Sequence, residues 1–151
     1  MKKLFVLLIA ALCLISGALP IWAEPLQRAV FTLGDRQYSV NKNTYTMDAA
    51  PFIEENRIFV PIRYLAYACG VSEQDVLWSD AFETVTLKKD ATTLQLQVGI
   101  DQAIRNGRVE ELDVAPIYRS GRTYLPARWI GEGLGYQVKW DEKDKTVTIE
   151  K

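Results

Sequence analysis

The sequence predicts an α+β fold in two layers, with a meandering antiparallel sheet packed against short helices. Apolar and polar residues alternate in several short segments, which is typical of strands with one buried face. Two other segments carry apolar residues at helical spacing between a proline and a glycine. The stretch from Asp48 to Leu65 also returns in ungapped register from Asp113 to Ile130. We therefore expect two sequence repeats, at about residues 31–90 and 94–151.

Each repeat is expected to begin with a hairpin. Strands are predicted at residues 31–33 and 94–98, and again at 37–40 and 102–105, where the chain runs into Asn41-Lys42 and Asn106-Gly107. Asn-Gly favours a two-residue hairpin turn, because both central residues of a type I′ turn need a positive φ. This part of each repeat is therefore predicted to be antiparallel.

A short strand and a short helix are expected next. The strands at 57–60 and 122–125 lead to Pro61 and Pro126, and proline suits the first helical position because its missing N–H would have no partner there. The apolar residues at helical spacing are Ile62, Leu65, Ala66 and Cys69, and then Ala127, Ile130, Gly131 and Leu134. Gly70 and Gly135 are expected to end the helices in a left-handed conformation. Helices of two turns are stable only when they pack against a sheet.

The last hairpin of each repeat carries a tryptophan. Trp78 and Trp140 lie in predicted strands at 76–78 and 138–140, and the returning strands alternate threonine with apolar residues. A residue that recurs in both repeats is better explained by a structural role than by catalysis, since an active site needs each group once. The recurring positions with expected structural roles are Asp48, Pro51, Arg57, Pro61, Arg63, Gly70 and Trp78, and Asp113, Pro116, Arg122, Pro126, Arg128, Gly135 and Trp140.

Residues 1–23 have the pattern of a secretory signal peptide. Two lysines precede an apolar run from Leu4 to Ile15, and Ala23 is a small residue at the expected cleavage point. The run is shorter than the roughly twenty residues that a membrane anchor needs. A lipid anchor at Cys13 is disfavoured because the residue before it is not small. We expect a secreted protein, outside the cell or at its surface, with one domain over residues 24–151 and no membrane contact after cleavage.

The composition disfavours several functions. The chain contains no histidine, so a serine triad would need an unusual base. Its 18 basic and 19 acidic residues nearly balance, and no Lys/Arg cluster indicates a nucleic-acid site. Cys69 is expected to be a buried, unreactive thiol. The glycines from Gly131 to Gly135 fall at a helix end, not in a phosphate-binding loop. We predict no catalytic residue, no cofactor and no metal.

Acidic residues allow two other interpretations. Residues 141–144 could offer oxygen ligands to a metal, but they lack calcium-loop spacing and glycine, so a hairpin tip is favoured. Asp48 and Asp113 could be the paired carboxylates of a glycosidase, but their duplication favours a role in turns. A hydrolase of the cell envelope, or an inhibitor of one, is the alternative function.

Arg63 and Arg128 lie in the first turn of the predicted helices, where the helix dipole disfavours a positive charge. We expect each guanidinium to reach loop carbonyls or the carboxylate of Asp48 or Asp113, or to stack on a tryptophan. The alternative is a pair of arginines that binds anions.

Aromatic residues supply the candidate contact surface. Tyr64 and Trp129 lie off the apolar stripes of the helices, and Tyr67, Tyr118 and Tyr136 lie near loops. Exposed aromatic side chains can stack on sugar rings or anchor a protein partner. We expect most of them to edge the core, with Tyr64 and Trp129 as the contact surface.

The order of motifs resembles a known family. Asp113-x-x-Pro116, Gly121-Arg122-Thr123, Pro126-x-Arg128, Val138-x-Trp140-Asp141 and Thr146-Val147-Thr148-Ile149 are similar to the copper amine oxidase N-terminal-like domain, or stalk domain, of secreted bacterial proteins. The first repeat departs from this pattern at Asn56 and Ile58. The resemblance implies a two-layer α+β module that accompanies exported or cell-surface proteins and has no activity of its own. Amine oxidase chemistry itself is excluded, because its copper is held by histidines.

We therefore expect a secreted, non-catalytic binding or structural module at the cell envelope. A cell-wall component or an exported protein is the expected partner. Self-association through an open edge strand is a further expectation.

Overall fold

The computed structural model describes residues 27–151. The signal peptide expected at residues 1–23 lies outside the described residues, as do residues 24–26 of the expected domain. The described residues form three antiparallel sheets and two short α-helices, so the α+β class is confirmed.

The sheets are defined as follows. Sheet 1 has the order β13 (Gln137–Asp141), β14 (Thr146–Glu150), β1 (Arg28–Thr32), β2 (Gln37–Val40) and β3 (Asn43–Thr46). Sheet 2 has the order β10 (Arg108–Glu111), β9 (Gln102–Arg105), β8 (Thr92–Gln97), β7 (Thr84–Lys89) and β6 (Val76–Ser79). Sheet 3 has the order β11 (Ile117–Arg119), β12 (Arg122–Pro126), β5 (Arg57–Pro61) and β4 (Phe52–Glu54).

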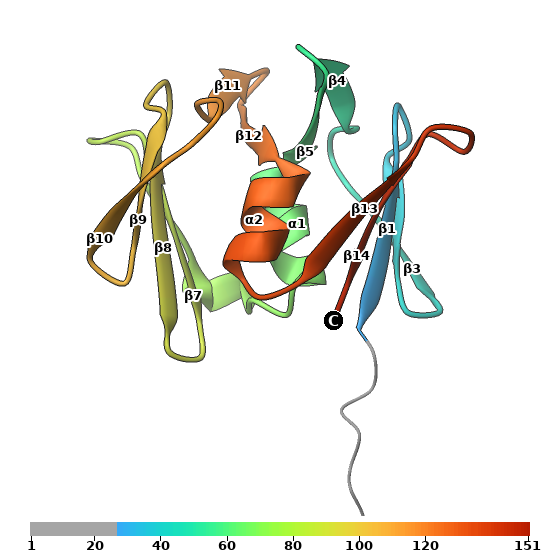
Figure 1. Ribbon diagram of the computed structural model, residues 1–151, viewed down its shortest axis with the longest axis horizontal. Helices are drawn as coiled ribbons and strands as arrows, with labels where there is room; N and C mark the ends of the chain where they lie inside the picture. Colours follow the sequence, from blue (N-terminus) through green and yellow to red (C-terminus); the bar gives the residue numbers. More distant parts are fainter. Residues whose placement is uncertain (1–26) are drawn as a thin grey trace, which may run out of the picture.

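The two helices occupy the centre of the molecule. Helix α1 (Ile62–Ala68) and helix α2 (Ala127–Gly133) contact one another, and Figure 1 shows them between sheets 1 and 2 with sheet 3 above. A single turn of 3₁₀-helix, η1 (Glu73–Asp75), connects α1 to β6. Because the helices lie between sheets, each can bury its apolar stripe without being long enough to be stable alone.

The ends of both helices are as predicted, to within one residue at the start. Pro61 and Pro126 are the last residues of β5 and β12, and the helices begin directly after them. Gly70 and Gly135 have φ of 78° and 86°. After α1, the Gly70 N–H donates to Tyr67 O (2.9 Å) and the Val71 N–H to Ala66 O (3.0 Å), and α2 ends with the same pair of bonds. This is the Schellman arrangement, which needs a residue with positive φ after the helix.

The two-residue turns expected at Asn41-Lys42 and Asn106-Gly107 are present, and they join β2 to β3 and β9 to β10. Asn106 and Gly107 both have positive φ, at 49° and 79°, whereas at Asn41-Lys42 only Asn41 does, at 56°. Each asparagine also accepts a hydrogen bond on Oδ1 from the backbone of the neighbouring strand, at 3.0 Å for Asn41 and 2.8 Å for Asn106. The side chains thus stabilise the turns that their backbones form.

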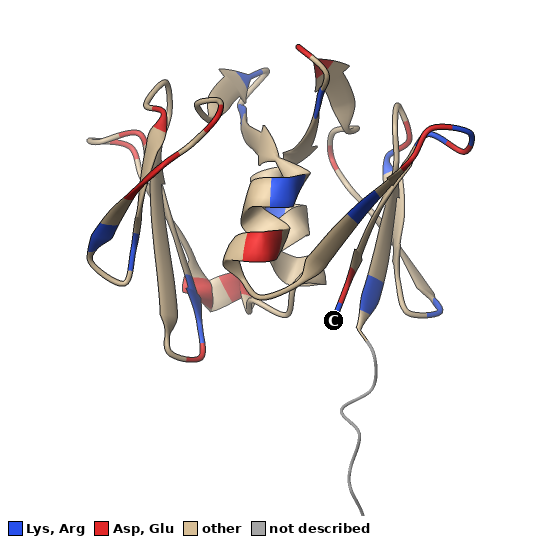
Figure 2. Ribbon diagram, in the orientation of Figure 1, with Lys and Arg blue, Asp and Glu red and all other residues tan. Residues whose placement is uncertain are grey.

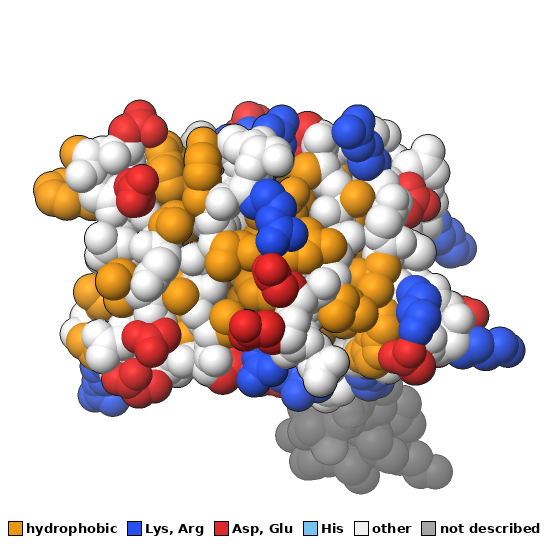
Figure 3. Space-filling view, turned by 90° about the horizontal axis from the view of Figure 1, so that it is seen from above, with side chains coloured by type: hydrophobic (Ala, Val, Ile, Leu, Met, Phe, Trp, Pro, Cys, Tyr) orange, Lys and Arg blue, Asp and Glu red, His pale blue; other side chains and the backbone are white. Residues whose placement is uncertain are grey.

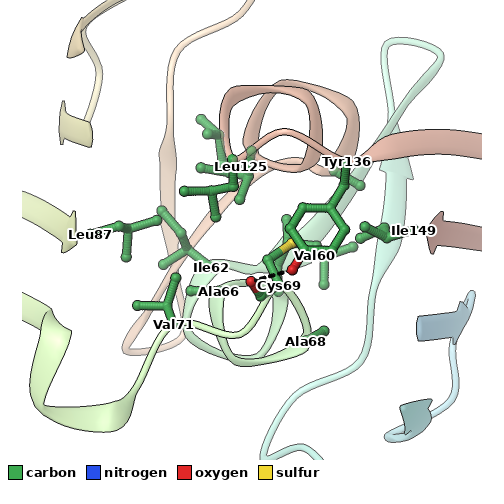
Figure 4. Close-up of a cluster of buried hydrophobic side chains, with 14 of the residues drawn as sticks. Val60, Ile62, Ala66, Ala68, Cys69, Val71, Leu87, Leu125, Tyr136 and Ile149 are labelled. Atoms are coloured by element: carbon green, nitrogen blue, oxygen red, sulfur yellow. Dashed lines mark hydrogen bonds between the residues drawn. The ribbon is translucent and has the colours of Figure 1, made fainter. Parts of the chain in front are cut away.

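The core is one cluster of buried apolar side chains contributed by both helices and all three sheets. Figure 4 shows part of it, with Val60 and Leu125 from sheet 3, Ala66 from α1, and Cys69 directly after that helix. The predicted apolar stripes are buried, since Leu65, Cys69 and Ile130 have no exposed surface. Close packing requires Gly131 on α2, because a Cβ there would lie 2.4 Å from Val138 Cγ2.

The prediction of one meandering sheet in two layers is wrong. Sheet 2 alone is a meander throughout, from β6 to β10, because Pro61 and Pro126 end β5 and β12 and lead straight into helices. A proline has no N–H to extend a strand ladder. The chain therefore leaves sheet 3 through α1 and α2, and its last hairpin, β13–β14, pairs with β1 to complete sheet 1.

Sheets 1 and 2 have corresponding registers. In sheet 1, Val147 lies between Trp140 and Phe31, and in sheet 2 Val85 lies between Trp78 and Leu96. In sheet 3, β5 and β12 pair antiparallel with Val60 opposite Leu125. Each side of the molecule therefore has one tryptophan-bearing hairpin at the edge of its five-stranded sheet.

Four strands were not predicted. Strands β3, β4, β10 and β11 have three or four residues each, and every residue of β3 is exposed. Segments this short and exposed carry no alternation of apolar and polar residues.

Candidate functional site

Two grooves on the surface of residues 27–151 lie at corresponding junctions of the fold. Groove 1 lies where α1 meets the β6–β7 hairpin and the β11–β12 hairpin, and its volume is about 330 Å³. Groove 2 lies where α2 meets the β13–β14 hairpin and the β4–β5 hairpin, and its volume is about 720 Å³. Figure 1 places α2 and β13 on the viewer's side.

The two grooves have matching side chains. Groove 1 is lined by Trp78, Tyr64, Arg63, Arg122 and Asp48. Groove 2 is lined by Trp140, Trp129, Arg128, Arg57 and Asp113. Each groove therefore combines a strand tryptophan, an aromatic residue and an arginine on the helix, and an arginine and an aspartate from outside the helix. The structure brings both residues of the expected contact surface, Tyr64 and Trp129, into these grooves.

An arginine–aspartate pair forms one wall of each groove. Arg122 Nη2 lies 2.7 Å from Asp48 Oδ2, and Arg57 Nε lies 2.7 Å from Asp113 Oδ2. The pairs are crossed, because each joins an arginine of one half of the sequence to an aspartate of the other. Each arginine also donates to a backbone carbonyl two residues earlier, at 2.9 Å for Arg122 and 3.1 Å for Arg57.

The carboxyl group of Asp48 is held in its ionised form. Its hydrogen bond with Arg122 lowers the pKa below the ordinary value of 3.8, and a hydrogen bond with Tyr64 acts in the same direction, while burial opposes both. A general acid for glycoside hydrolysis needs the opposite shift. The geometry therefore suits a fixed ion pair better than proton transfer.

The partners of Arg63 and Arg128 differ from those expected. The carboxylates of Asp48 and Asp113 are taken by the strand arginines, while Arg128 Nε lies 3.8 Å from Glu132 Oε1 one helical turn away. Within residues 27–151, no acidic side chain forms an ion pair with Arg63. Both helix arginines are exposed. They are therefore available at the groove surfaces.

Each strand tryptophan is fixed within its own hairpin. The Trp78 indole donates to Asp80 Oδ1 at 2.6 Å, and the Trp140 indole donates to Glu142 Oε2 at 2.8 Å. Trp78 is 42% exposed, although it is a large aromatic residue. An oriented and exposed indole is a ready surface for stacking.

The aromatic residues on the helices are half-buried. Trp129 and Tyr64 pack against the core, and the Tyr64 hydroxyl accepts a hydrogen bond from the Asp48 N–H at 3.2 Å. The guanidinium of Arg105 lies 5.7 Å from the centroid of the Trp129 ring. Both residues thus edge the core and line a groove at once.

The remaining tyrosines lie in different places. Tyr118 is 59% exposed and lines groove 1. Tyr67 is half-buried on α1 with its ring edge against Tyr64. Tyr136 is buried, and its hydroxyl donates to Cys69 O at 2.7 Å (Figure 4). Only the first of the three therefore contributes to an open surface.

The acidic residues at 141–144 form a hairpin tip. Asp141 Oδ1 accepts hydrogen bonds from the N–H groups of Lys143 (2.9 Å) and Asp144 (3.0 Å). Glu142 pairs with Lys145 and with the Trp140 indole. In the described part of the chain, no group of three histidine, cysteine, aspartate or glutamate residues could hold a metal ion.

Charges are spread over the surface. Figure 2 shows basic and acidic positions on all three sheets, and in Figure 3 apolar side chains reach the surface among charged ones. Among residues 27–151, neither helix is long and apolar enough to span a membrane.

The sequence indicated most of the side chains that line the grooves, but it did not indicate that they come together in two grooves. Arg57 and Arg122 were predicted as structural positions without their partners, and Tyr118 was not assigned to the contact surface. One feature of the sequence could have indicated these ion pairs, namely that an aspartate followed by an arginine recurs in both halves of the sequence.

Comparison with known families places the chain in relation to a described domain. The family model described as the copper amine oxidase N-terminal domain matches residues 39–149. No curated protein matches the chain.

Proposed function

The chain belongs to the copper amine oxidase N-terminal domain family, and from this premise we propose that it is a secreted, non-catalytic module that binds a cell-wall glycan. The observation that carries the proposal is the pair of matched grooves, each with a tryptophan, a second aromatic residue and an arginine–aspartate pair. The matching family model describes the N-terminal domain of copper amine oxidase, and the absence of histidine from the sequence excludes a copper site built from histidines.

A glycan is the ligand class that these side chains suit best. Flat aromatic rings stack on the apolar faces of sugars, and paired charged groups offer donors and acceptors to hydroxyls. Both groove volumes, about 330 and 720 Å³, are in the range of small-ligand sites. Location at the cell envelope is supported by the signal-peptide pattern of residues 1–23.

We also propose that the domain consists of two copies of one structural unit. The recurring sequence, the corresponding registers of sheets 1 and 2 and the crossed arginine–aspartate pairs support this. Two copies would present two binding grooves on one molecule, and two weak sites on one polymer bind more strongly than either alone.

Co-sedimentation with purified, insoluble bacterial cell wall tests the proposal. The chain without its first 23 residues should pellet saturably, and Trp78→Ala and Trp140→Ala should each weaken binding by about tenfold or more, as anchor tryptophans do. Phe82→Ala is the matched control, because Phe82 is 69% exposed but lines neither groove. Circular dichroism should show that all three variants are folded.

The proposal fails if the unsubstituted protein does not pellet. Pelleting that is equally weakened by Phe82→Ala would place binding on general surface hydrophobicity instead of the grooves. Binding of an exported protein in place of the wall would then be the next hypothesis.

A further inference from the structure

The two grooves have corresponding side chains but differ in volume and in charge. Groove 1 is lined by Arg63 and Arg122 and by a single carboxylate, that of Asp48. Groove 2 is lined by two arginines and by four carboxylates, those of Glu111, Asp113, Glu132 and Glu142. Groove 1 therefore has an excess of positive charge, and groove 2 has an excess of negative charge.

The excess in groove 1 resides on one side chain. Arg122 is held by Asp48 at 2.7 Å and by Ser120 O at 2.9 Å. Arg63 forms no ion pair with any acidic side chain of residues 27–151. Its counterpart in groove 2, Arg128, has Glu132 at 3.8 Å. Arg63 is thus the one groove arginine with an uncommitted guanidinium.

An uncommitted guanidinium suits a carboxylate. Its planar fork of N–H donors matches the two coplanar oxygens of a carboxylate, and such charge-assisted pairs are stronger than neutral hydrogen bonds. One free arginine also balances one negative charge. In groove 2, Arg57 and Arg128 already pair with Asp113 and Glu132, so the same anion would find no uncommitted guanidinium there. It would also meet an excess of carboxylates, and like charges repel it.

An aromatic surface lies beside this arginine in groove 1. Trp78 is 42% exposed, and Tyr118, which also lines groove 1, is 59% exposed. A sugar ring can stack on an exposed aromatic ring while its acidic substituent pairs with Arg63. Groove 1 thus offers an aromatic ring to the sugar ring and a guanidinium to its acidic substituent.

We infer that groove 1 is the subsite for an acidic sugar, whose carboxylate pairs with Arg63, and that groove 2 takes neutral sugar units. The inference rests on the proposed function, because it assigns a ligand class to one of the two proposed glycan grooves. The ligand chemistry is a pyranose ring that carries one carboxylate.

Two disaccharides that differ in one carboxylate test the inference. N-acetylglucosaminyl-N-acetylmuramic acid carries a free lactyl carboxylate, and di-N-acetylchitobiose has the same backbone without it. Titration calorimetry at low salt should show about tenfold or greater preference for the acidic disaccharide, the factor expected of one charged hydrogen-bonded pair. Arg63→Ala should remove the preference, and Arg128→Ala, the matched control, should keep it. Both arginines are exposed, so an unchanged melting temperature will show that each variant is folded.

The outcomes separate the inference from the proposed function. Equal affinity of the unsubstituted protein for both disaccharides overturns the inference and leaves glycan binding in place. A preference that survives Arg63→Ala but is lost in Arg128→Ala also overturns it, by placing the acid in groove 2. Binding of neither disaccharide overturns the inference and removes the support for glycan binding in the grooves as well.

Discussion

Burial determines the chemistry of Cys69. The side chain has no exposed surface, and its position between α1 and the Tyr136 ring is visible in Figure 4. Burial raises the pKa of the thiol to about 12, although the nearby Lys89 acts in the opposite direction. Since the thiolate is the reactive form, the folded protein should not use this residue as a nucleophile.

Alkylation kinetics check this prediction. The protein without residues 1–23, which contain Cys13, has Cys69 as its single cysteine. At pH 8 this folded protein should react with iodoacetamide only as fast as it unfolds, and in 6 M guanidinium chloride it should react at the rate of a free cysteine. Reaction of the folded protein at the free-cysteine rate would contradict the burial of Cys69.

Asp48 should make stability depend on pH. Its folded-state pKa lies below the ordinary value of 3.8, first because of the hydrogen bond from Arg122. A lowered pKa means that the carboxylate stabilises the fold above pH 3.8, and that this stabilisation is lost as the pH falls below 3.8 through the folded-state pKa. The free energy of unfolding, measured by urea titration between pH 2.5 and 6, should therefore fall in this window.

Asp48→Asn should flatten part of this dependence, and Arg122→Ala should flatten the same part. The pKa values of Glu142 and Glu150 are also lowered, by hydrogen bonds with Lys145 and Lys139 respectively, so some dependence on pH should survive in both variants. An unaltered profile in Asp48→Asn would show that the pair with Arg122 does not form in solution.

Residue-level prediction from sequence succeeded where the cause was local. Gly70 and Gly135 were predicted as left-handed helix ends because the sequence immediately before them has helical spacing, and their φ values confirm it. The partners of Arg57 and Arg122 could not be predicted, because each ion pair joins residues that are distant in the sequence. Such contacts depend on how β5 and β12 pair, which no local pattern encodes.

At the scale of elements, the contact between α2 and β13 depends on a glycine. A Cβ on Gly131 would lie 2.4 Å from Val138 Cγ2, and valine cannot easily rotate away because its χ1 is restricted. Gly131→Ala should therefore lower the free energy of unfolding by about 1 to 3 kcal/mol, as overpacking does, despite the better helix propensity of alanine.

Chemical denaturation measures this effect. Glu132→Ala changes the adjacent, exposed position of the same helix and should alter the free energy of unfolding by no more than about 0.5 kcal/mol. A Gly131→Ala variant as stable as the unsubstituted protein would mean that α2 and β13 lie farther apart than described.

Elements with strong periodicity were predictable, and the shortest ones were not. The helices after Pro61 and Pro126 and the tryptophan-bearing hairpins follow from capping residues and alternation. Strand β3 was missed because all of its residues are exposed, so neither face shows an apolar pattern. This segment forms a strand because the turn after Asn41 places it beside β2, where their backbones pair. It does not contribute to the core.

At the scale of the whole molecule, sheet 1 joins distant parts of the sequence. Strand β1 pairs with β14, and Val147 and Ile149 of β14 are buried in the core. Burial of each such side chain contributes roughly 1.5 to 3 kcal/mol, and the total stability of a domain is about 5 to 15 kcal/mol. A chain that ends at residue 136, without β13 and β14, should therefore not fold.

Far-UV circular dichroism and amide proton dispersion in an NMR spectrum check this prediction. Glu142→Ala is the control, since it changes the tip of the same hairpin and should leave the fold intact. Native-like spectra from the shortened chain would show that sheet 2 and the helices form a separate stable unit.

The number of sheets could not be predicted because pairing between distant strands is not a local property. Each predicted hairpin was compatible with one continuous meander, and the sequence gives no register between β1 and β14. The helices after Pro61 and Pro126 interrupt the meander, and only packing of the whole chain decides which edges meet. The same reason explains why the grooves, which lie at junctions of three elements, were not foreseen.

The pairing of β1 with β14 also decides how the domain responds to force. The two strands are antiparallel with Arg28 opposite Glu150, and the Lys151 N–H donates to Gln27 O at 3.0 Å. Tension applied between Gln27 and Lys151 would load this ladder from one end, so its hydrogen bonds would break one after another as in a zipper. Strands that are pulled in shear resist the force because many hydrogen bonds bear the load together. The hydrogen bonds between β1 and β14 would not share the load in this way. Force applied at these two residues should therefore open the module easily, which would suit a binding domain better than a load-bearing spacer.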